Sequence, residues 1–244
     1  MTKIDYLKEL TELKKPYIIY KSNKGFDLYT DFSKKIILTN NNIKSFINKA
    51  TQFKFKKKET DIFIGFFGYE ILNNLIGVKI KKQKGLKFPK GIFYKPETKV
   101  KLQKKLDYKN LELIKSNKPF KVNINKPSYK VIFDKFKKKI KSGETYQIKI
   151  CTKYSNTAQI DALDFFCRLV KTNMAPEAFM IKDKNYSIIS CSPENLINKK
   201  NDFITTKPIA GTLKKTSKLN KTKALVFFRK NLKETKEHNM IVDM

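Results

Sequence analysis

The sequence predicts an α+β fold with large antiparallel β-sheets and helices beside them. Two observations indicate this class: the expected strands mostly follow one another through short turns, and regular helical crossovers between them are few. A hydrophobic content of 40%, with 12% aromatic residues, excludes a disordered chain. With 244 residues, the chain is long enough to form a core without disulfide bonds.

The first sixty residues predict two helices and a small antiparallel sheet. Ile4–Leu13 has the apolar spacing of a short amphipathic helix, which Pro16 stops. A second helix is expected at Asn41–Thr51. Between the helices lie three β-rich runs separated by turn residues: Tyr17–Tyr20, Phe26–Tyr29 and Lys35–Thr39.

The middle of the chain contains two different kinds of segment. Asp61–Ile71 is mostly apolar and has Gly65 and Gly68 three residues apart. This pattern predicts a segment buried on both sides, whose glycines let another backbone approach closely. Leu75–Asn125 is rich in lysine and predicts a solvent-facing meander with three strand-like islands: Gly91–Tyr94, Lys99–Leu102 and Phe120–Val122.

Helices and strands alternate in the remainder of the chain. Pro127 and Ser128 open a helix, and Gly143 ends it. The expected elements are helices at Tyr129–Lys141 and Asp161–Lys171, strands at Tyr146–Tyr154 and Thr205–Ile209, a hairpin of Ala178–Ile181 with Tyr186–Cys191, and a helical tail from Lys221.

The net charge of +32 first indicates a nucleic-acid binder. However, all but two of the 54 basic residues are lysine, and they are scattered over the whole chain. Because lysine lacks the planar fork with which arginine reads phosphates and guanine edges, we expect no specific nucleic-acid partner. No run of about 18 apolar residues is present, so no contact with a membrane is expected.

The cysteines and the N-terminus predict a cytoplasmic protein. Cys151, Cys167 and Cys191 have no metal-ligand spacing and cannot all pair, which favours a reducing compartment. The N-terminus is charged from its third residue and lacks the apolar region of a secretory signal.

The sequence contains no glycine-rich phosphate loop and no Ser-His-Asp elbow. The remaining candidates for catalytic and binding residues are short segments in the last hundred residues. Gly143–Gln147 leads from a helix into a strand that carries the amide of Gln147. Ser190–Glu194 ends a β-run in a proline turn, where a fixed and accessible carboxylate can act as a general acid. Taken alone, Gln147 is an ordinary strand residue and Glu194 a solvent-facing turn residue.

Two further segments carry groups suited to anions and cations. In Lys207–Thr212, the Ala-Gly-Thr turn offers backbone amides and a hydroxyl that can hold a carboxylate or an enolate oxygen. In Lys236–Asp243, Glu237 falls on the apolar stripe of a helix, and a divalent cation is one candidate for its partner. The simpler interpretation of the first segment is a tight turn after a strand. The simpler interpretation of His238, in the second segment, is a lone surface histidine.

Taken in order, these segments resemble the signature blocks of the chorismate-utilising enzymes. The similarity is greatest to the family of anthranilate synthase component I and aminodeoxychorismate synthase component I, and it extends over about residues 60–244. The blocks are GFFGYE at 65–70, GETYQ at 143–147, SCSPENL at 190–196, KPIAGT at 207–212 and KEHNMIVD at 236–243. The resemblance implies an N-terminal region at residues 1–125 and, at 126–244, the first part of a chorismate-binding catalytic domain.

The resemblance also implies a fold, a cofactor and roles for residues. The fold would be a sandwich of two large antiparallel sheets with flanking helices, and the cofactor Mg²⁺. Glu194 would be the acid that helps the C4 hydroxyl of chorismate to leave, and His238 the family histidine beside the metal ligand. Glu237 would bind Mg²⁺, and the substrate would contact the turn residues Ala210, Gly211 and Thr212.

Gln147 indicates the type of reaction. Family members that add water to chorismate have a lysine base at the matching position, and a neutral amide cannot deprotonate water. The sequence therefore resembles an aminating member, fed with ammonia by a glutamine amidotransferase subunit (component II). Ala210 replaces the lysine that one subgroup of aminodeoxychorismate synthases carries, and together with His238 it favours anthranilate synthase and tryptophan biosynthesis. The alternatives are aminodeoxychorismate synthase, in p-aminobenzoate and folate biosynthesis, or an inactive fragment that needs a partner chain.

Three departures from the family accompany this resemblance. The region before residue 65 is short and lacks an LLES-type motif for tryptophan feedback. Ala175–Ala178 reads Ala-Pro-Glu-Ala, whereas a tryptophan-sensitive synthase usually reads Ser-Pro-Tyr-Met. The family continues beyond the position of Met244 with R-N-D and nearly half of its catalytic domain, so we expect the chain to be truncated relative to the family.

Overall fold

A computed structural model describes residues 3–51, 58–78, 88–103, 106, 108, 119–158, 160–200, 202–209 and 211–243. The chain forms two compact units. One unit contains Met1–Asp107 together with Phe166–Met244, and the other contains Tyr108–Phe165. Each unit is described by itself below.

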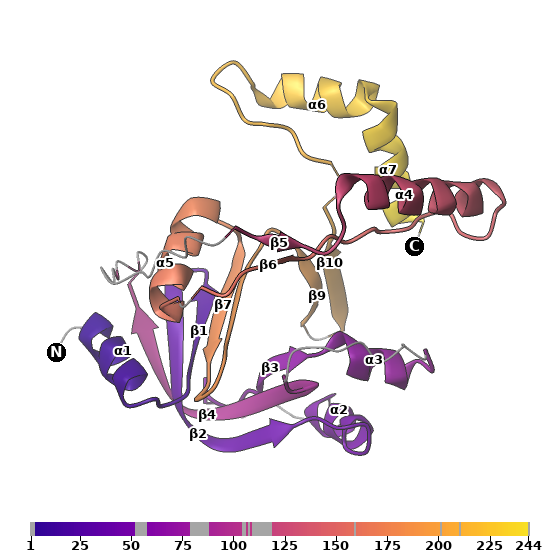
Figure 1. The fold of residues 1–244 in the computed structure, drawn as a ribbon. Helices are drawn as coiled ribbons and strands as arrows, with labels where there is room; N and C mark the ends of the chain where they lie inside the picture. Colours follow the sequence, from indigo (N-terminus) through magenta and orange to yellow (C-terminus); the bar gives the residue numbers. More distant parts are fainter. Residues whose placement is uncertain are drawn as a thin grey trace. The chain divides into compact units, whose positions relative to one another are not determined.

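The first unit is built on a six-stranded sheet in which every pairing is antiparallel (Figure 1). The strand order is β3-β4-β2-β1-β7-β8. The strands are β1 (Tyr17–Ser22), β2 (Gly25–Ile37), β3 (Ile64–Phe67), β4 (Gly91–Leu102), β7 (Glu177–Lys182) and β8 (Ser187–Ser192). The α+β class and the hairpin of β7 with β8 are confirmed, while the sandwich and the domain division at residue 125 stay predictions.

Two strands are longer than the sequence indicates: β2, and β4, which joins the islands predicted separately at Gly91–Tyr94 and Lys99–Leu102. The runs predicted separately at Phe26–Tyr29 and Lys35–Thr39 largely belong to the single strand β2, which pairs with β4 over most of its length. The register shifts between Phe32 and Lys34, and Asp31 has a φ of 52°. A bulge therefore absorbs the polar residues that the sequence presents as a turn.

The core of the sheet begins at β1. Its consecutive residues Tyr17, Ile18 and Ile19 are all buried, and because side chains alternate along a strand, both faces of the sheet are covered there. On one side the hydroxyl groups of Thr11 and Tyr17 lie 3.0 Å apart, which fixes helix α1 (Lys3–Glu12) against the strand. The helix predicted at Ile4–Leu13 is thus confirmed.

The glycine-rich segment after residue 61 differs from its prediction. Only β3 is extended; it is a partly exposed edge strand, and helix α3 (Tyr69–Leu75) begins two residues later. Burial on both sides is confirmed only in part: Ile64 and Phe66 pack against one core cluster and Phe63 against another, but residues 61–70 are half-buried or exposed. Close backbone approach is confirmed: a Cβ on Gly65 would overlap with the carbonyl oxygen of Ile92.

A buried carboxylate joins the β7–β8 turn to the middle of the sheet. Asp183 accepts hydrogen bonds from Tyr94 and, at 3.2 Å, from Tyr186, and it forms an ion pair with Lys35 at 2.7 Å. Burial raises the pKa of Asp183, but the bonds from Lys35 and Tyr94 outweigh this and hold the pKa below its usual value. Burial also raises the pKa of Tyr94.

We expect Asp183→Asn to lower the free energy of unfolding by about 2 kcal/mol near neutral pH, because it leaves Lys35 unpaired beside two phenols. Since the folded-state pKa of Asp183 is depressed, its contribution is present above the unfolded pKa of about 4 and is lost as the pH falls below it. Urea denaturation at pH 7 and pH 3 measures both effects. An equal loss at the two pH values would contradict this account, and Asp31→Asn, on an exposed carboxylate, is the control.

The rest of the first unit consists of helices and one hairpin. Strands β9 (Asn195–Lys200) and β10 (Phe203–Lys207) form a separate antiparallel ladder. The helices are α2 (Ile43–Thr51), α5 (Ala162–Asn173, which begins in the second unit), α6 (Lys221–Lys230) and α7 (Leu232–Val242). The tail from Lys221 is helical as predicted, but Asn231 interrupts it, because its side chain accepts bonds from the amides of Lys233 and Glu234 and so caps α7.

In its described residues, the second unit has one long helix and little sheet. Helix α4 (Lys126–Lys141) confirms the prediction, with Asn125 as its N-cap and Gly143, at a φ of 77°, after its end. The strand predicted at Tyr146–Tyr154 is wrong: only β6 (Tyr154–Ser155) is extended, against β5 (Lys121–Val122). Because β5 has two residues, it offers no longer edge to pair with. In the part of the chain that the structure describes, no helix meets the length and hydropathy of a bilayer span.

Candidate active site

Glu194 lies in the turn between β8 and β9, where the sequence analysis places it. The hydroxyl of Ser192 donates to the carbonyl oxygen of Glu194 at 2.9 Å and accepts from its amide at 3.2 Å. Pro193 fixes the backbone between them. The turn therefore closes on itself and presents the exposed side chain of Glu194 in a defined direction.

The carboxylate of Glu194 contacts the second predicted segment. Its Oε1 atom accepts a hydrogen bond of 3.1 Å from the backbone amide of Ile209. Ile209 follows β10 and directly precedes the Ala-Gly-Thr turn. The β9–β10 hairpin thus brings together two segments that are fifteen residues apart and that the sequence analysis assigned to one site.

A bridge of side chains supports the Glu194 turn from the main sheet. The carboxylate of Glu177, the first residue of β7, accepts a hydrogen bond from the side-chain amide (Nδ2) of Asn195 at 3.3 Å and one from the hydroxyl of Tyr20 at 3.0 Å. Burial, followed by this bond, raises the pKa of Tyr20 to about 12. Glu177 was not among the site residues predicted from the sequence; the available signal was the departure from the family at residues 175–178, which read Ala-Pro-Glu-Ala.

Gly211 lies against the side chains of α6 and α7. Gly211 has a φ of 75°, and a Cβ there would overlap with Oε2 of Glu234 and lie 3.0 Å from the ring of Phe228. Thr212 is exposed beside it, and Ala210 lies outside the described residues. Glycine is therefore required at 211 both by the backbone conformation and by the side chains that approach it.

Glu234 is the second residue that the sequence analysis missed. Its side chain is 13% exposed, Oε1 lies 3.7 Å from Nζ of Lys233, and Oε2 is buried with no hydrogen-bond partner among the described residues. A buried carboxylate oxygen without a partner is unfavourable unless a ligand completes it. The available signal was the acidic residue one helical turn before Glu237.

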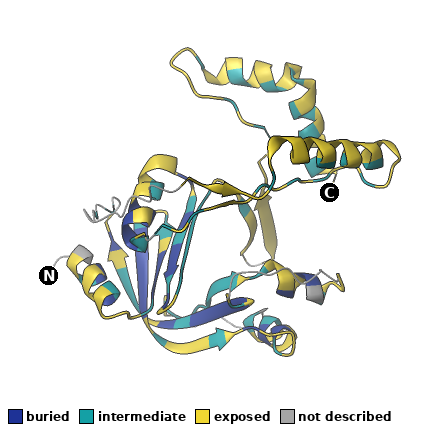
Figure 2. Ribbon diagram, viewed as in Figure 1, coloured by how far each residue is buried: buried dark blue, intermediate teal, exposed yellow. Residues whose placement is uncertain are grey.

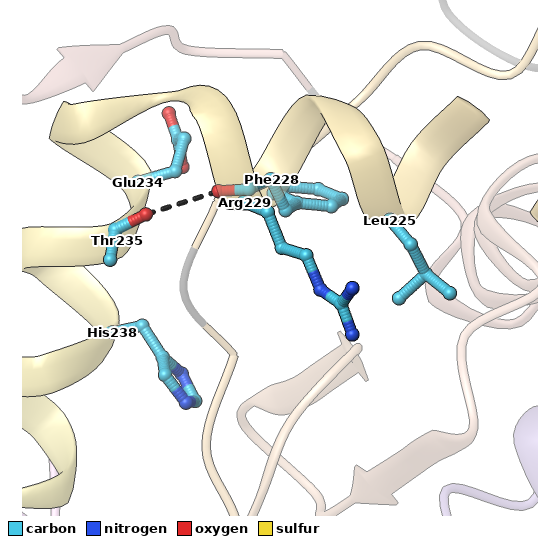
Figure 3. Close-up of a pocket in the computed structure, with 6 residues that line it drawn as sticks. All are labelled: Leu225, Phe228, Arg229, Glu234, Thr235 and His238. Atoms are coloured by element: carbon cyan, nitrogen blue, oxygen red, sulfur yellow. Dashed lines mark hydrogen bonds between the residues drawn. The ribbon is translucent and has the colours of Figure 1, made fainter. Parts of the chain in front are cut away.

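Helices α6 and α7 line a pocket of about 400 Å³ that is open to solvent and lies next to this carboxylate (Figure 3). The hydroxyl of Thr235 donates to the carbonyl oxygen of Phe228 at 3.1 Å and joins the two helices. His238 lines the pocket one turn beyond Glu234 on α7. The pocket is lined by Leu225, Phe228, Arg229, Glu234, Thr235 and His238.

The remaining predicted residues are placed less closely. Glu237 is half-buried on α7, and Met244, the end of its predicted apolar stripe, lies outside the described residues. Gln147 is exposed and lies outside any strand, because the strand predicted at Tyr146–Tyr154 is absent. Its carbonyl oxygen accepts a hydrogen bond of 3.1 Å from the hydroxyl of Thr145. Gln147 belongs to the second compact unit, so its position relative to Glu194 stays a prediction.

Two carboxylates of α7 could hold a hard divalent cation that keeps several ligands from water or substrate. Glu234 and Glu237 stand one helical turn apart, and the buried oxygen of Glu234 is uncompensated. Within the described ranges, no three His, Cys, Asp or Glu side chains converge as a complete metal cage. Two carboxylates are a partial donor set, of the kind that Mg²⁺ accepts.

Comparison with known proteins assigns the chain to a family of enzymes. The model of the chorismate binding enzyme family matches residues 8–244, so the chain belongs to that family. The chain is 29% identical to anthranilate synthase component 1 of Bacillus subtilis over 153 residues, which is 59% of this chain and 30% of the relative.

Relatives of two activities match the chain. Aminodeoxychorismate synthase component 1 of Bacillus subtilis is 30% identical over 112 residues, covering 46% of this chain and 24% of that protein. Anthranilate synthase component 1 of Buchnera aphidicola is 28% identical over 225 residues, covering 75% and 43% respectively. The chain therefore spans less than half the length of these curated relatives.

Proposed function

We propose that the protein is an ammonia-using chorismate enzyme of the anthranilate synthase component I type. It would add ammonia to chorismate with loss of the 4-hydroxyl and then eliminate pyruvate to give anthranilate. The observation that carries the proposal is the hydrogen bond between Glu194 and Ile209, because it joins two of the blocks that resemble the family. The membership of residues 8–244 in the chorismate binding enzymes supports it.

Each proposed role follows from the chemistry of its residue. Hydroxide is a poor leaving group, so Glu194 would donate a proton to the 4-hydroxyl as it departs. The amide of Gly211 and the hydroxyl of Thr212, with Ala210 beside them, would bind a carboxylate of chorismate. His238 would orient the substrate or move a proton in the pocket between α6 and α7.

Gln147 favours ammonia over water as the nucleophile. A carboxamide is no base at neutral pH, so it cannot generate hydroxide, whereas ammonia attacks without further deprotonation. We further propose that a glutamine amidotransferase subunit supplies the ammonia. Ala210 and His238 favour anthranilate over aminodeoxychorismate as the product.

We propose Mg²⁺ as the cofactor, held by Glu237 and Glu234. When bound, the ion would neutralise the carboxylate charge of chorismate and polarise its oxygen atoms. The buried oxygen of Glu234 supports this assignment, because a cation would compensate it. Glu234 would also fix the orientation of α7 beside Gly211.

The proposal is tested by incubating the protein with chorismate, ammonium and Mg²⁺, in the presence and absence of a chelator, and identifying the product. We expect a fluorescent product with the mass of anthranilate, formed only when Mg²⁺ is present. A product with the mass of 4-amino-4-deoxychorismate and no anthranilate fluorescence would assign the protein to the alternative enzyme. Turnover that survives complete chelation would contradict the role of Glu234 and Glu237.

A further inference from the structure

The turn that carries Glu194 joins two different sheets. Strand β8 ends at Ser192 in the six-stranded sheet, and β9 begins at Asn195 in the two-stranded ladder, so only Pro193 and Glu194 lie between them. The residues of β9 after Asn195 and all residues of β10 are exposed, and Figure 2 shows both strands mostly in the colour of exposed residues. The direction of the ladder, and with it that of Glu194, therefore depends on polar contacts at its base.

Glu177 contacts the residues that begin and end this turn. It lies opposite Ser192 in the register of β7 with β8. Ser192 in turn bonds through its hydroxyl to the amide and to the carbonyl group of Glu194. At the other end, the carboxylate of Glu177 accepts a hydrogen bond of 3.3 Å from the side-chain amide of Asn195. One residue of the main sheet thus links both ends of the turn.

Tyr20 fixes the carboxylate of Glu177 from the neighbouring strand β1. The two carboxylate oxygens have different partners: Oε1 accepts from Asn195, and Oε2 accepts from the hydroxyl of Tyr20 at 3.0 Å. Burial, followed by this bond, raises the pKa of Tyr20 to about 12, so the phenol remains a donor at neutral pH. Because both oxygens are bonded, the carboxylate cannot rotate without losing a partner. The position of Asn195 is therefore fixed relative to the six-stranded sheet.

The ladder carries this constraint to the other side of Glu194. Asn195 lies opposite Lys207, the last residue of β10, and Ile209 follows two residues later. The backbone amide of Ile209 donates a hydrogen bond of 3.1 Å to Oε1 of Glu194. The turn, the ladder and this bond form a closed ring of contacts, which is attached to Glu177 through Asn195. Displacing Asn195 would therefore displace the amide that orients the carboxylate of Glu194.

We propose that Glu177 is a positioning residue that orients the carboxylate of Glu194 against the amide of Ile209. It acts through Asn195, and Tyr20 holds it in place. The use of the oriented carboxylate rests on the proposed function, in which its proton goes to the departing hydroxyl group of chorismate. The orientation itself is a property of the folded chain and can be measured without a reaction.

Hydrogen exchange of the Ile209 amide, followed by NMR in the 244-residue chain, tests the orientation. Glu177→Ala removes both bonds of the bridge, so this exchange should become about fivefold faster, while exchange in β2 and β4 stays unchanged. Glu177→Gln keeps an oxygen that accepts from Asn195, and its exchange should stay within about twofold of that of the unchanged chain. Tyr20→Phe keeps the ring and removes one of the two bonds, so an intermediate increase is expected.

Two controls separate positioning from general stability. Asp183→Asn, at the opposite end of the β7–β8 hairpin, should destabilise the sheet but leave the exchange of Ile209 unchanged. In a Glu194→Ala background the carboxylate is absent, so Glu177→Ala should have no further effect on this exchange. If Glu177 only stabilised the hairpin, its removal would accelerate the exchange equally in both backgrounds.

Kinetics of a preparation that turns over chorismate test the consequence for the reaction. A misdirected acid affects the transition state and not the binding of the substrate. Glu177→Ala should therefore lower kcat by about tenfold and leave KM for chorismate unchanged, and Glu177→Gln should restore most of the rate. In a Glu194→Gln background, Glu177→Ala should cause no further loss. Glu97→Ala, on an exposed carboxylate of β4, is the control.

The two measurements distinguish the positioning role from the proposed function. Unchanged exchange of Ile209 in Glu177→Ala, or an equal increase in the Glu194→Ala background, would overturn the positioning role. The expected exchange pattern without turnover by the unchanged chain would support the positioning of the carboxylate and contradict the proposed function. Turnover with the same kcat in the unchanged chain and in Glu177→Ala would support the proposed function and overturn the positioning role.

Discussion

Glu194→Gln is expected to lower chorismate turnover by about 10²–10⁴-fold with little change in stability. Glutamine keeps a side-chain oxygen that accepts from the amide of Ile209, so the contact between the two turns should persist. It loses the proton that the departing 4-hydroxyl needs. Steady-state kinetics of a preparation that turns over chorismate measures the loss, and urea denaturation checks the fold.

A matched variant makes this result interpretable. Glu97→Gln removes an exposed carboxylate from β4 and should leave both turnover and stability unchanged. If Glu194→Gln retained the unchanged rate, Glu194 would not be the acid. If it lost stability together with activity, Glu194 would act by fixing the Ala-Gly-Thr turn.

Gly211→Ala is expected to lower the free energy of unfolding by about 2–3 kcal/mol and to weaken the binding of Mg²⁺ at the proposed site. An alanine at a φ of 75° is strained, and its Cβ would displace the carboxylate of Glu234. Glu234 is a proposed ligand of Mg²⁺, so displacing its carboxylate should also raise the Mg²⁺ concentration needed for half-maximal turnover. Chemical denaturation and a Mg²⁺ titration of the rate measure the two effects.

Two controls separate backbone strain from the side-chain clash. Gly77 has a φ of 77°, and a Cβ added there would have no described atom within 4 Å, so Gly77→Ala should show only the strain, about 1 kcal/mol. In a Glu234→Ala background, the effect of Gly211→Ala should fall toward this value, because the clash with the carboxylate is gone and only the contact with the ring of Phe228 adds to the strain. Equal effects of Gly211→Ala in both backgrounds would contradict the contact between the turn and α7.

Local patterns were sufficient for much of the fold. The helix at the N-terminus, helix α4 and the β7–β8 hairpin follow from apolar spacing, caps and turn residues. The length of β2 was not predictable in this way, because a bulge at residues 32–34 is fixed by its pairing with β4. The strand expected at Tyr146–Tyr154 failed for the same reason, since a strand needs a partner that its own sequence does not specify.

The site was predicted in part, and its missing residues are those defined by distant contacts. Glu194 and the segment up to Thr212 were identified from their residues, and the bond to Ile209 joins them. Glu177 and Glu234 were missed, because one is recognised through Asn195 and Tyr20 and the other through Gly211. Packing and hydrogen bonding in the folded chain identify Glu177 and Glu234 as residues of the candidate site, whereas their spacing along the sequence does not.

Isotope incorporation tests the central claim, amination of chorismate, most directly. Chorismate is incubated with Mg²⁺, ammonium labelled with heavy nitrogen and water labelled with heavy oxygen, and the products are analysed by mass spectrometry. We expect heavy nitrogen in the aromatic product and no heavy oxygen, with the signal absent in Glu194→Gln. A product that carries heavy oxygen and no heavy nitrogen would show addition of water and would contradict the account.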